Sequence, residues 1–204
     1  SKEQVARFNQ IPPRTAGKTA QGACEPSDAE ACLQQGWIAL NSGSYQLAFE
    51  SYQLACIEGA SEGCRYLGWL YAEGLVGGGQ RKAAESYHQA CELDDGWSCF
   101  ALGVLLDQGI GVPQSKKRAA QLYQKGCALQ EQLACLNLAV LYSRGEGVSQ
   151  SKENTLKLYT QACESGLQQA CIDLAELYLK GELVEQNMDL AARLYQTACR
   201  AGEA

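Results

Sequence analysis

The chain has 204 residues and a formal net charge of −6, from 17 Lys and Arg against 23 Asp and Glu. Hydrophobic residues make up 46% and charged residues 20%, which is typical of a globular protein and excludes wholesale disorder. The acidic balance argues against a nucleic-acid binder that neutralises phosphates, and no apolar run reaches the roughly 18 residues of a transmembrane helix. The N-terminus lacks the charged-then-apolar pattern of a signal peptide, and Ser1 in place of Met indicates a mature or trimmed form, which leaves room for a lipid anchor before Ser1.

Two regions follow one another along the chain. Residues 1–22 contain Pro12-Pro13 and no repeated pattern, so we expect a lead-in segment there. From 23 to 204, apolar positions three and four residues apart predict short amphipathic helices, arranged as a first and a second helix in each of five units. First helices are expected near 29–41, 61–73, 97–108, 133–144 and 169–180, and second helices near 45–57, 80–92, 115–128, 152–164 and 188–201.

The cysteines are periodic. Ten of the 11 form pairs eight residues apart, which are Cys24 and Cys32, Cys56 and Cys64, Cys91 and Cys99, Cys127 and Cys135, and Cys163 and Cys171. A zinc site would require closer cysteine clusters or several histidines, and the chain has only His88. Ten cysteines in five identical contexts are not typical of catalytic thiols either. We therefore expect five local disulfides and a free thiol at Cys199, in an oxidising compartment for which the bacterial periplasm is the first choice.

Other positions repeat with the cysteines. A tyrosine lies four residues before a cysteine in each unit, and a leucine followed by a small residue lies three residues after the second cysteine of a pair. The tyrosines are Tyr52, Tyr87, Tyr123, Tyr159 and Tyr195, and the leucines are Leu67, Leu102, Leu138 and Leu174. Such constant apolar positions predict the core, and a period of 36 residues predicts a solenoid in which each unit packs on its neighbours.

The repeated pattern resembles the Sel1-like repeat, a relative of the tetratricopeptide repeat. The resemblance is carried by the string Ala134-Cys135-x2-Leu138-Ala139-x-Leu141-Tyr142-x2-Gly145-x-Gly147-Val148, followed by x10-Tyr159-x2-Ala162-Cys163. The cysteine pairs make it similar to the disulfide-rich branch of the Helicobacter cysteine-rich proteins. Gln35, Thr155 and Leu183 depart from the repeat pattern. The resemblance implies an all-α, right-handed α/α solenoid of about five helix–loop–helix repeats cross-linked by C-x7-C disulfides.

By analogy with tetratricopeptide repeats, the first helices should line a concave face. Residues there that are not needed for packing vary from unit to unit, and all three tryptophans are among them. An alternative interpretation is that the tryptophans pack between adjacent first helices. The candidate partner-binding residues are Trp37, Arg65, Trp69, Glu73, Trp97, Phe100, Val104, Asp107, Leu136, Val140, Arg144, Glu176 and Lys180.

Catalytic motifs are weak in this chain. Some cysteine-rich relatives are described as penicillin-binding, and Ser149 to Lys152 is formally S-x-x-K, but it lies in a predicted loop and its companion motifs are incomplete. Gly77 to Gly79 do not form a phosphate-binding loop pattern, and no cofactor is expected.

The sequence therefore predicts a non-enzymatic protein-interaction scaffold in the periplasm. Within that class, the resemblance favours an immunity protein that blocks a secreted toxin of the type VI phospholipase kind. An envelope assembly or signalling adaptor is one alternative, and a weak β-lactam hydrolase is another.

Overall fold

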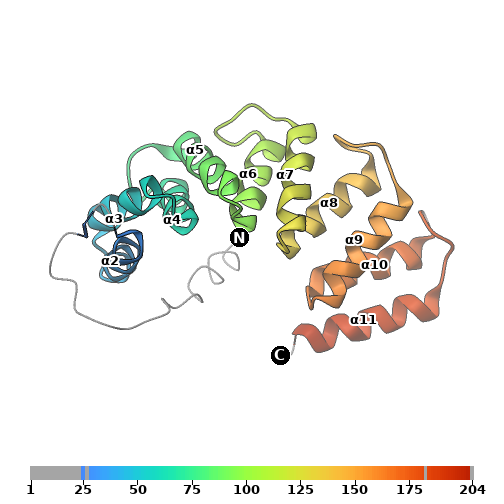
Figure 1. Ribbon diagram of the computed structural model, residues 1–204. Coiled ribbons are helices and arrows are strands. Elements are labelled where there is room, and N and C mark those ends of the chain that lie inside the picture. Colours follow the sequence, from blue (N-terminus) through green and yellow to red (C-terminus); the bar gives the residue numbers. More distant parts are fainter. Residues whose placement is uncertain (1–23, 26–27, 182, 203–204) are drawn as a thin grey trace.

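The helices follow one another along an arch in the computed structural model, which describes residues 24–25, 28–181 and 183–202 (Figure 1). These residues form ten α-helices and no strand. The first helices are α2 (Ala29–Asn41), α4 (Ser61–Ala72), α6 (Gly96–Gln108), α8 (Gln132–Arg144) and α10 (Gln168–Lys180), and the second helices are α3 (Tyr45–Ile57), α5 (Gly79–Glu92), α7 (Lys116–Ala128), α9 (Lys152–Glu164) and α11 (Met188–Gly202). Each predicted helix end lies within one residue of the observed one. The predicted lead-in segment, residues 1–22, lies outside the described residues.

Local capping explains where several helices begin and end. The side chains of Asp28, Asp95, Ser115 and Ser151 each accept a hydrogen bond from a backbone N–H in the first turn. At the other end, α6, α8 and α10 end at Gly109, Gly145 and Gly181, whose φ angles of 71°, 69° and 69° place them in the left-handed region that favours glycine.

All five predicted disulfides are present. Four of them join the end of one unit to the first helix of the next, and Cys24–Cys32 joins the residues before α2 to α2, with Cα–Cα distances of 4.6 to 5.1 Å. Cys199 takes part in none of these bonds and lies exposed on α11. The predicted all-α solenoid of helix–loop–helix units with C-x7-C disulfides is thereby confirmed.

The repeated tyrosine and leucine positions form the core. The leucines Leu67, Leu102, Leu138 and Leu174 are buried, as are the tyrosines Tyr52, Tyr87, Tyr123 and Tyr159. Glycine is needed beside Leu67 and Leu102, because a Cβ at Gly68 or Gly103 would lie 2.5 Å from the ring of Tyr87 or Tyr123. Tyr195 differs from the expectation, since 37% of it is exposed. No described helix follows α11 to cover it, as α8 follows Tyr123.

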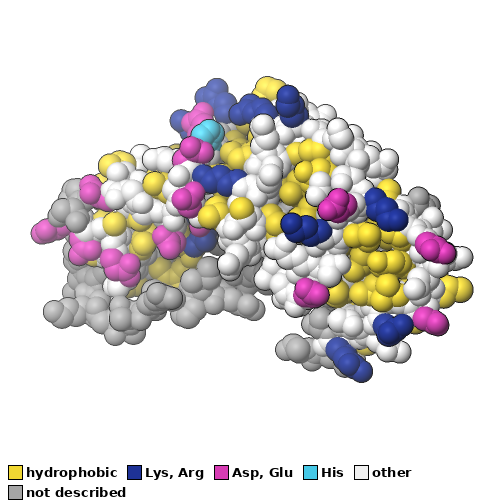
Figure 2. Space-filling model, turned by 45° about the vertical axis from the view of Figure 1, so that its right-hand side comes forward, with side chains coloured by type: hydrophobic (Ala, Val, Ile, Leu, Met, Phe, Trp, Pro, Cys, Tyr) yellow, Lys and Arg dark blue, Asp and Glu magenta, His cyan; other side chains and the backbone are white. Residues whose placement is uncertain are grey.

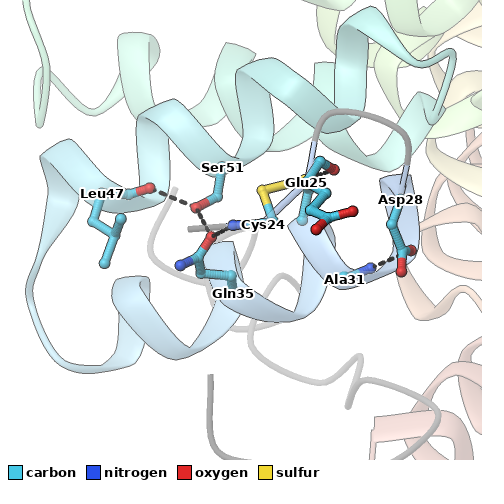
Figure 3. Close-up of a disulfide and its surroundings, with 8 residues drawn as sticks. Cys24, Glu25, Asp28, Ala31, Gln35, Leu47 and Ser51 are labelled. Atoms are coloured by element: carbon cyan, nitrogen blue, oxygen red, sulfur yellow. Dashed lines mark hydrogen bonds between the residues drawn. A yellow bond between two sulfur atoms is a disulfide. The ribbon is translucent and has the colours of Figure 1, made fainter. Parts of the chain in front are cut away.

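The departures from the repeat pattern also find local explanations. Gln35 is buried, and its side-chain carbonyl accepts hydrogen bonds from the Cys24 backbone N–H at 2.9 Å and the Ser51 hydroxyl at 3.2 Å, so it ties the first disulfide to α3 (Figure 3). Thr155 is fully buried, and its hydroxyl donates to the Ser151 carbonyl at 2.7 Å, which satisfies the polar group within its own helix. Val184, next to Leu183, is buried, so the last loop still packs onto the solenoid.

Candidate protein-interaction site

The thirteen candidate residues all lie on first helices or at their C-terminal ends. We call the surface formed by these residues and their neighbours the first-helix face. Trp37 is on α2, Arg65 and Trp69 are on α4 with Glu73 at its C-cap, and Trp97, Phe100, Val104 and Asp107 are on α6. Leu136, Val140 and Arg144 are on α8, and Glu176 and Lys180 are on α10.

Burial separates these candidates into groups. Phe100 is 4% exposed and Leu136 is 8% exposed, and both belong to the hydrophobic core. Their assignment as partner-binding residues is therefore corrected: they stabilise the fold. Glu73, Arg144 and Lys180 are exposed, and the remaining candidates are half-buried.

The tryptophans pack with neighbouring aromatic rings while remaining half-buried. The Trp97 ring meets Tyr87 edge-on at 5.5 Å and Phe100 at 6.5 Å between centroids, and Trp37 lies 6.4 Å from Tyr66. Trp69 packs against the core of the first two units. Each ring thus contributes to packing between units, as the alternative interpretation expects, and it is incompletely covered, so partner binding by the tryptophans stays a prediction.

Arg65 has a buried ionic partner in the next unit. Its guanidinium donates to the Asp95 carboxylate at 2.9 Å, with side-chain exposures of 13% and 8%. The other Asp95 oxygen accepts from the Ser98 backbone N–H at 2.7 Å. Arg65 was predicted as a partner-binding residue, but in the structure its charge forms an ion pair that links units two and three. Asp95 was not among the predicted site residues, although an aspartate just before a predicted helix indicates an N-cap.

We expect Asp95→Asn to lower the free energy of unfolding by about 2 to 3 kcal/mol, because it leaves the Arg65 charge buried without its carboxylate. The adjacent change Asp94→Asn is the matched control. Asp94 pairs with Lys125 at 3.0 Å, but its side chain is 70% exposed, so a loss of less than about 0.5 kcal/mol is expected. Urea denaturation of both variants measures the difference, and equal losses would contradict the role assigned to the buried pair.

A second bridge links units three and four. The Lys116 ammonium lies 2.6 Å from Glu146 and 3.0 Å from Asp107. The hydrogen bonds that Lys116 donates, first to Glu146 and then to Asp107, raise the pKa of Lys116, and the bond to Lys116 lowers the pKa of Glu146. Asp107 was a candidate for partner binding, and its carboxylate forms an ion pair with Lys116.

The charge of the first-helix face changes along the solenoid. At the C-terminal ends of the first helices, units two and three carry Glu73 and Asp107, whereas units four and five carry Arg144 and Lys180. Lys180 also contacts Glu176 at 2.9 Å. Figure 2 shows that Asp and Glu side chains predominate toward the N-terminal units, on the left of that view.

Two shallow hollows lie elsewhere on the surface. One of about 250 Å³ lies between α5 and α7 and is lined by His88, Arg118, Leu122 and Lys125, among others. Another of about 560 Å³ lies beside the loop before α11, with Leu156, Tyr178 and Leu190 in its wall. His88 is exposed on the surface of α5. In the described part of the chain, no group of three or more His, Cys, Asp or Glu side chains is arranged to hold a metal ion.

Among the residues that the structure describes, none of the helices combines the length and apolar character needed to span a bilayer.

Comparisons with known proteins agree with this architecture. The family model for the Sel1 repeat matches residues 61–95, 98–130, 132–167 and 168–203. No curated protein sequence matches the chain at a significant level. This family provides protein-interaction scaffolds.

Solved structures with a similar fold come from several bacteria. A protective antigen of uropathogenic Escherichia coli is 23% identical with a TM-score of 0.79, and the match covers 85% of this chain but only 38% of that protein. A Sel1 repeat protein from Oxalobacter formigenes is 21% identical with a TM-score of 0.79, over 98% of this chain and 77% of the other. An immunity protein from Pseudomonas aeruginosa is 22% identical with a TM-score of 0.53, over 96% of this chain and 70% of the other. At these identities the likeness concerns the fold alone.

Proposed function

Because the chain belongs to the Sel1 repeat family, we propose that it is a non-enzymatic scaffold that binds a partner protein in the periplasm. The five disulfides support an oxidising compartment, since cytosolic reductants keep thiols free. They also support a binding role, because a solenoid cross-linked between its units loses little conformational freedom when a partner docks on it.

One position of the first-helix face carries the proposal. Five residues after the second cysteine of each pair, all side chains are half-buried, yet their chemistry changes along the array. These residues are Trp37, Trp69, Val104, Val140 and Glu176. The core tyrosine position, by contrast, is the same in every unit. A position that keeps its exposure but changes its side chain is what a recognition surface on a repeating frame requires.

Within this class we favour an immunity protein that binds a secreted toxin, of the type VI phospholipase kind, and blocks it by occupying its surface. The fold shared with an immunity protein of Pseudomonas aeruginosa supports this choice by analogy. The half-buried tryptophans support it physically, because aromatic anchors are common among the residues that dominate tight protein interfaces.

The proposal is tested with the intact chain as bait on envelope and secreted fractions of its own bacterium. A specific partner should be purified and mixed with the chain, and light scattering should show a complex of fixed stoichiometry. An immunity protein should also abolish the enzymatic activity of that partner. A complex that leaves the partner fully active would contradict the immunity assignment, and the absence of any complex would contradict the scaffold proposal.

In such a complex, Trp69→Ala and Trp97→Ala are each expected to weaken binding by about 2 kcal/mol or more, roughly 30-fold in Kd, because each removes a desolvated aromatic anchor. Tyr45→Ala is the control, since Tyr45 is 39% exposed on α3, away from the first-helix face. Calorimetry on variants whose helical content matches the wild type gives the comparison. Wild-type affinity in both tryptophan variants would move the search for the interface to the second helices and loops.

A further inference from the structure

The first two units are far more acidic than the rest of the solenoid. Between residues 24 and 78 the sequence has seven Asp and Glu and a single cation, Arg65. All seven carboxylates are exposed, and none forms an ion pair within the described residues. They are Glu25, Asp28, Glu30, Glu50, Glu58, Glu62 and Glu73. Arg65 does not neutralise them, because its charge is paired with Asp95 of the next unit.

In the later units, several carboxylates form ion pairs with lysines. Lys125 contacts Glu92 and Asp94, Lys116 contacts Asp107 and Glu146, and Lys180 contacts Glu176. The excess of negative charge is therefore concentrated at one end of the molecule, where Figure 2 shows mainly acidic side chains. Such a one-sided field attracts a partner of opposite charge and increases its rate of association.

Aromatic rings accompany these carboxylates on the first-helix face. Tyr66 stacks on Tyr52 at 4.8 Å and lies 6.4 Å from Trp37, and Trp69 follows one turn later on the same helix. Glu62 lies four residues before Tyr66 on α4, and Glu73, at the C-cap of α4, lies four residues after Trp69, so each carboxylate is on the same side of the helix as an aromatic ring. A carboxylate beside an aromatic face is a favourable environment for a Lys or Arg side chain, which gains an ion pair and a cation–π contact together.

We infer that the first-helix face of units one and two binds a cationic segment of the partner protein, rich in Lys or Arg. This inference rests on the proposed scaffold function and specifies the chemistry of its partner. The segment places its cations between Glu62 and Glu73 and over the exposed parts of Trp37 and Trp69.

The test uses the full chain and a synthetic probe, a 16-residue peptide of alternating Lys and Gly, with its Glu-Gly counterpart as the negative control. All three tryptophans lie in units one to three, so their fluorescence reports binding near this face. The Lys-Gly probe should bind at low ionic strength and weaken at least about tenfold in 0.3 M salt, whereas the Glu-Gly probe should not bind. Absence of binding by the cationic probe to every form of the chain would overturn the inference.

A matched pair of variants separates a defined site from general attraction. The double change Glu62→Gln and Glu73→Gln should weaken probe binding about tenfold, because it removes the carboxylates that lie four residues from Tyr66 and Trp69 on α4. The double change Glu153→Gln and Glu164→Gln alters net charge equally at exposed positions of α9, and it should change binding by less than about twofold. Equal weakening in the two variants would show that only net charge matters and would refute the site.

Residues 1–22 are themselves basic, with Lys2, Arg7, Arg14 and Lys18 against Glu3. A full-length chain with these four cations changed to Gln therefore tests the alternative occupant. Tighter probe binding by this variant than by the wild type would support a cation-binding face for which the lead-in segment competes. If the Lys-Gly probe binds this variant and does not bind the wild type, the face is occupied by the lead-in segment, and the assignment of a partner protein as its occupant is wrong.

The native partner distinguishes failure of this inference from failure of the proposed function. If the purified partner binds the Glu62→Gln, Glu73→Gln variant as tightly as the wild type, the cationic-segment inference is wrong and the scaffold function stands.

Discussion

Reduction of the five disulfides is expected to lower the melting temperature sharply and to broaden the unfolding transition. Each bond closes a ring across an eight-residue separation. Loop-closure entropy for a ring of this size corresponds to about 2 to 3 kcal/mol per bond. Together the five bonds account for about 10 to 15 kcal/mol, which is comparable to the whole stability of a typical domain.

The broadening follows from the repeat architecture. Each unit of a solenoid contacts only its neighbours, so cooperativity depends on the strength of each junction between units. In this chain four of the five disulfides lie at such junctions, for example Cys91–Cys99 between α5 and α6. Reduction weakens all junctions at once, and terminal units should then unfold before central ones.

Thermal unfolding followed by circular dichroism, with and without strong reductant, measures this effect. The oxidation state is checked first, because the non-reduced chain should be ten hydrogens lighter than the fully reduced chain by mass spectrometry, as five bonds require. An unchanged melting curve in reductant would show that the bonds add nothing to stability, and six or more alkylatable thiols would contradict the oxidising compartment.

The sequence predicted the helices well because a repeat reports the same packing several times. Tyr87, Tyr123 and Tyr159 occupy equivalent buried sites, so each unit confirms the assignment made for the others. Cysteine spacing was equally informative, because only a tight corner brings two residues eight apart within disulfide distance five times over.

The candidate site was harder to predict because burial on a first helix depends on the neighbouring unit. Phe100 and Leu136 follow their cysteines at the same repeat position as Arg65, yet they are buried in the core whereas Arg65 is half-buried. The partner of Arg65 lies 30 residues away at Asp95 and occurs in one unit only. Periodicity carries no information about a contact that does not repeat.

Tyr123→Ala is expected to lower the free energy of unfolding by about 3 to 5 kcal/mol, because it removes a large side chain from a well-packed core. Tyr123 is 1% exposed, and its ring lies against Gly103 of α6 and 6.2 Å from Phe100. Burial raises the pKa of its hydroxyl, to which the Asn137 side chain is hydrogen-bonded. The ring thus joins α6, α7 and α8, and a cavity in its place would weaken two successive units.

Tyr195→Ala is a control matched by the repeat itself. Tyr195 occupies the same repeat position on α11, but it is 37% exposed, so the same truncation should cost less than about 1.5 kcal/mol. Leu138 is 4% exposed, so Leu138→Ala should lower the free energy of unfolding by about 2 to 5 kcal/mol, as much as Tyr123→Ala. Urea denaturation of the three variants under oxidising conditions gives the comparison. If Tyr195→Ala destabilises the chain as much as Tyr123→Ala, the outer face of α11 is covered in solution, and the burial of this repeat position no longer explains the difference between inner and terminal units.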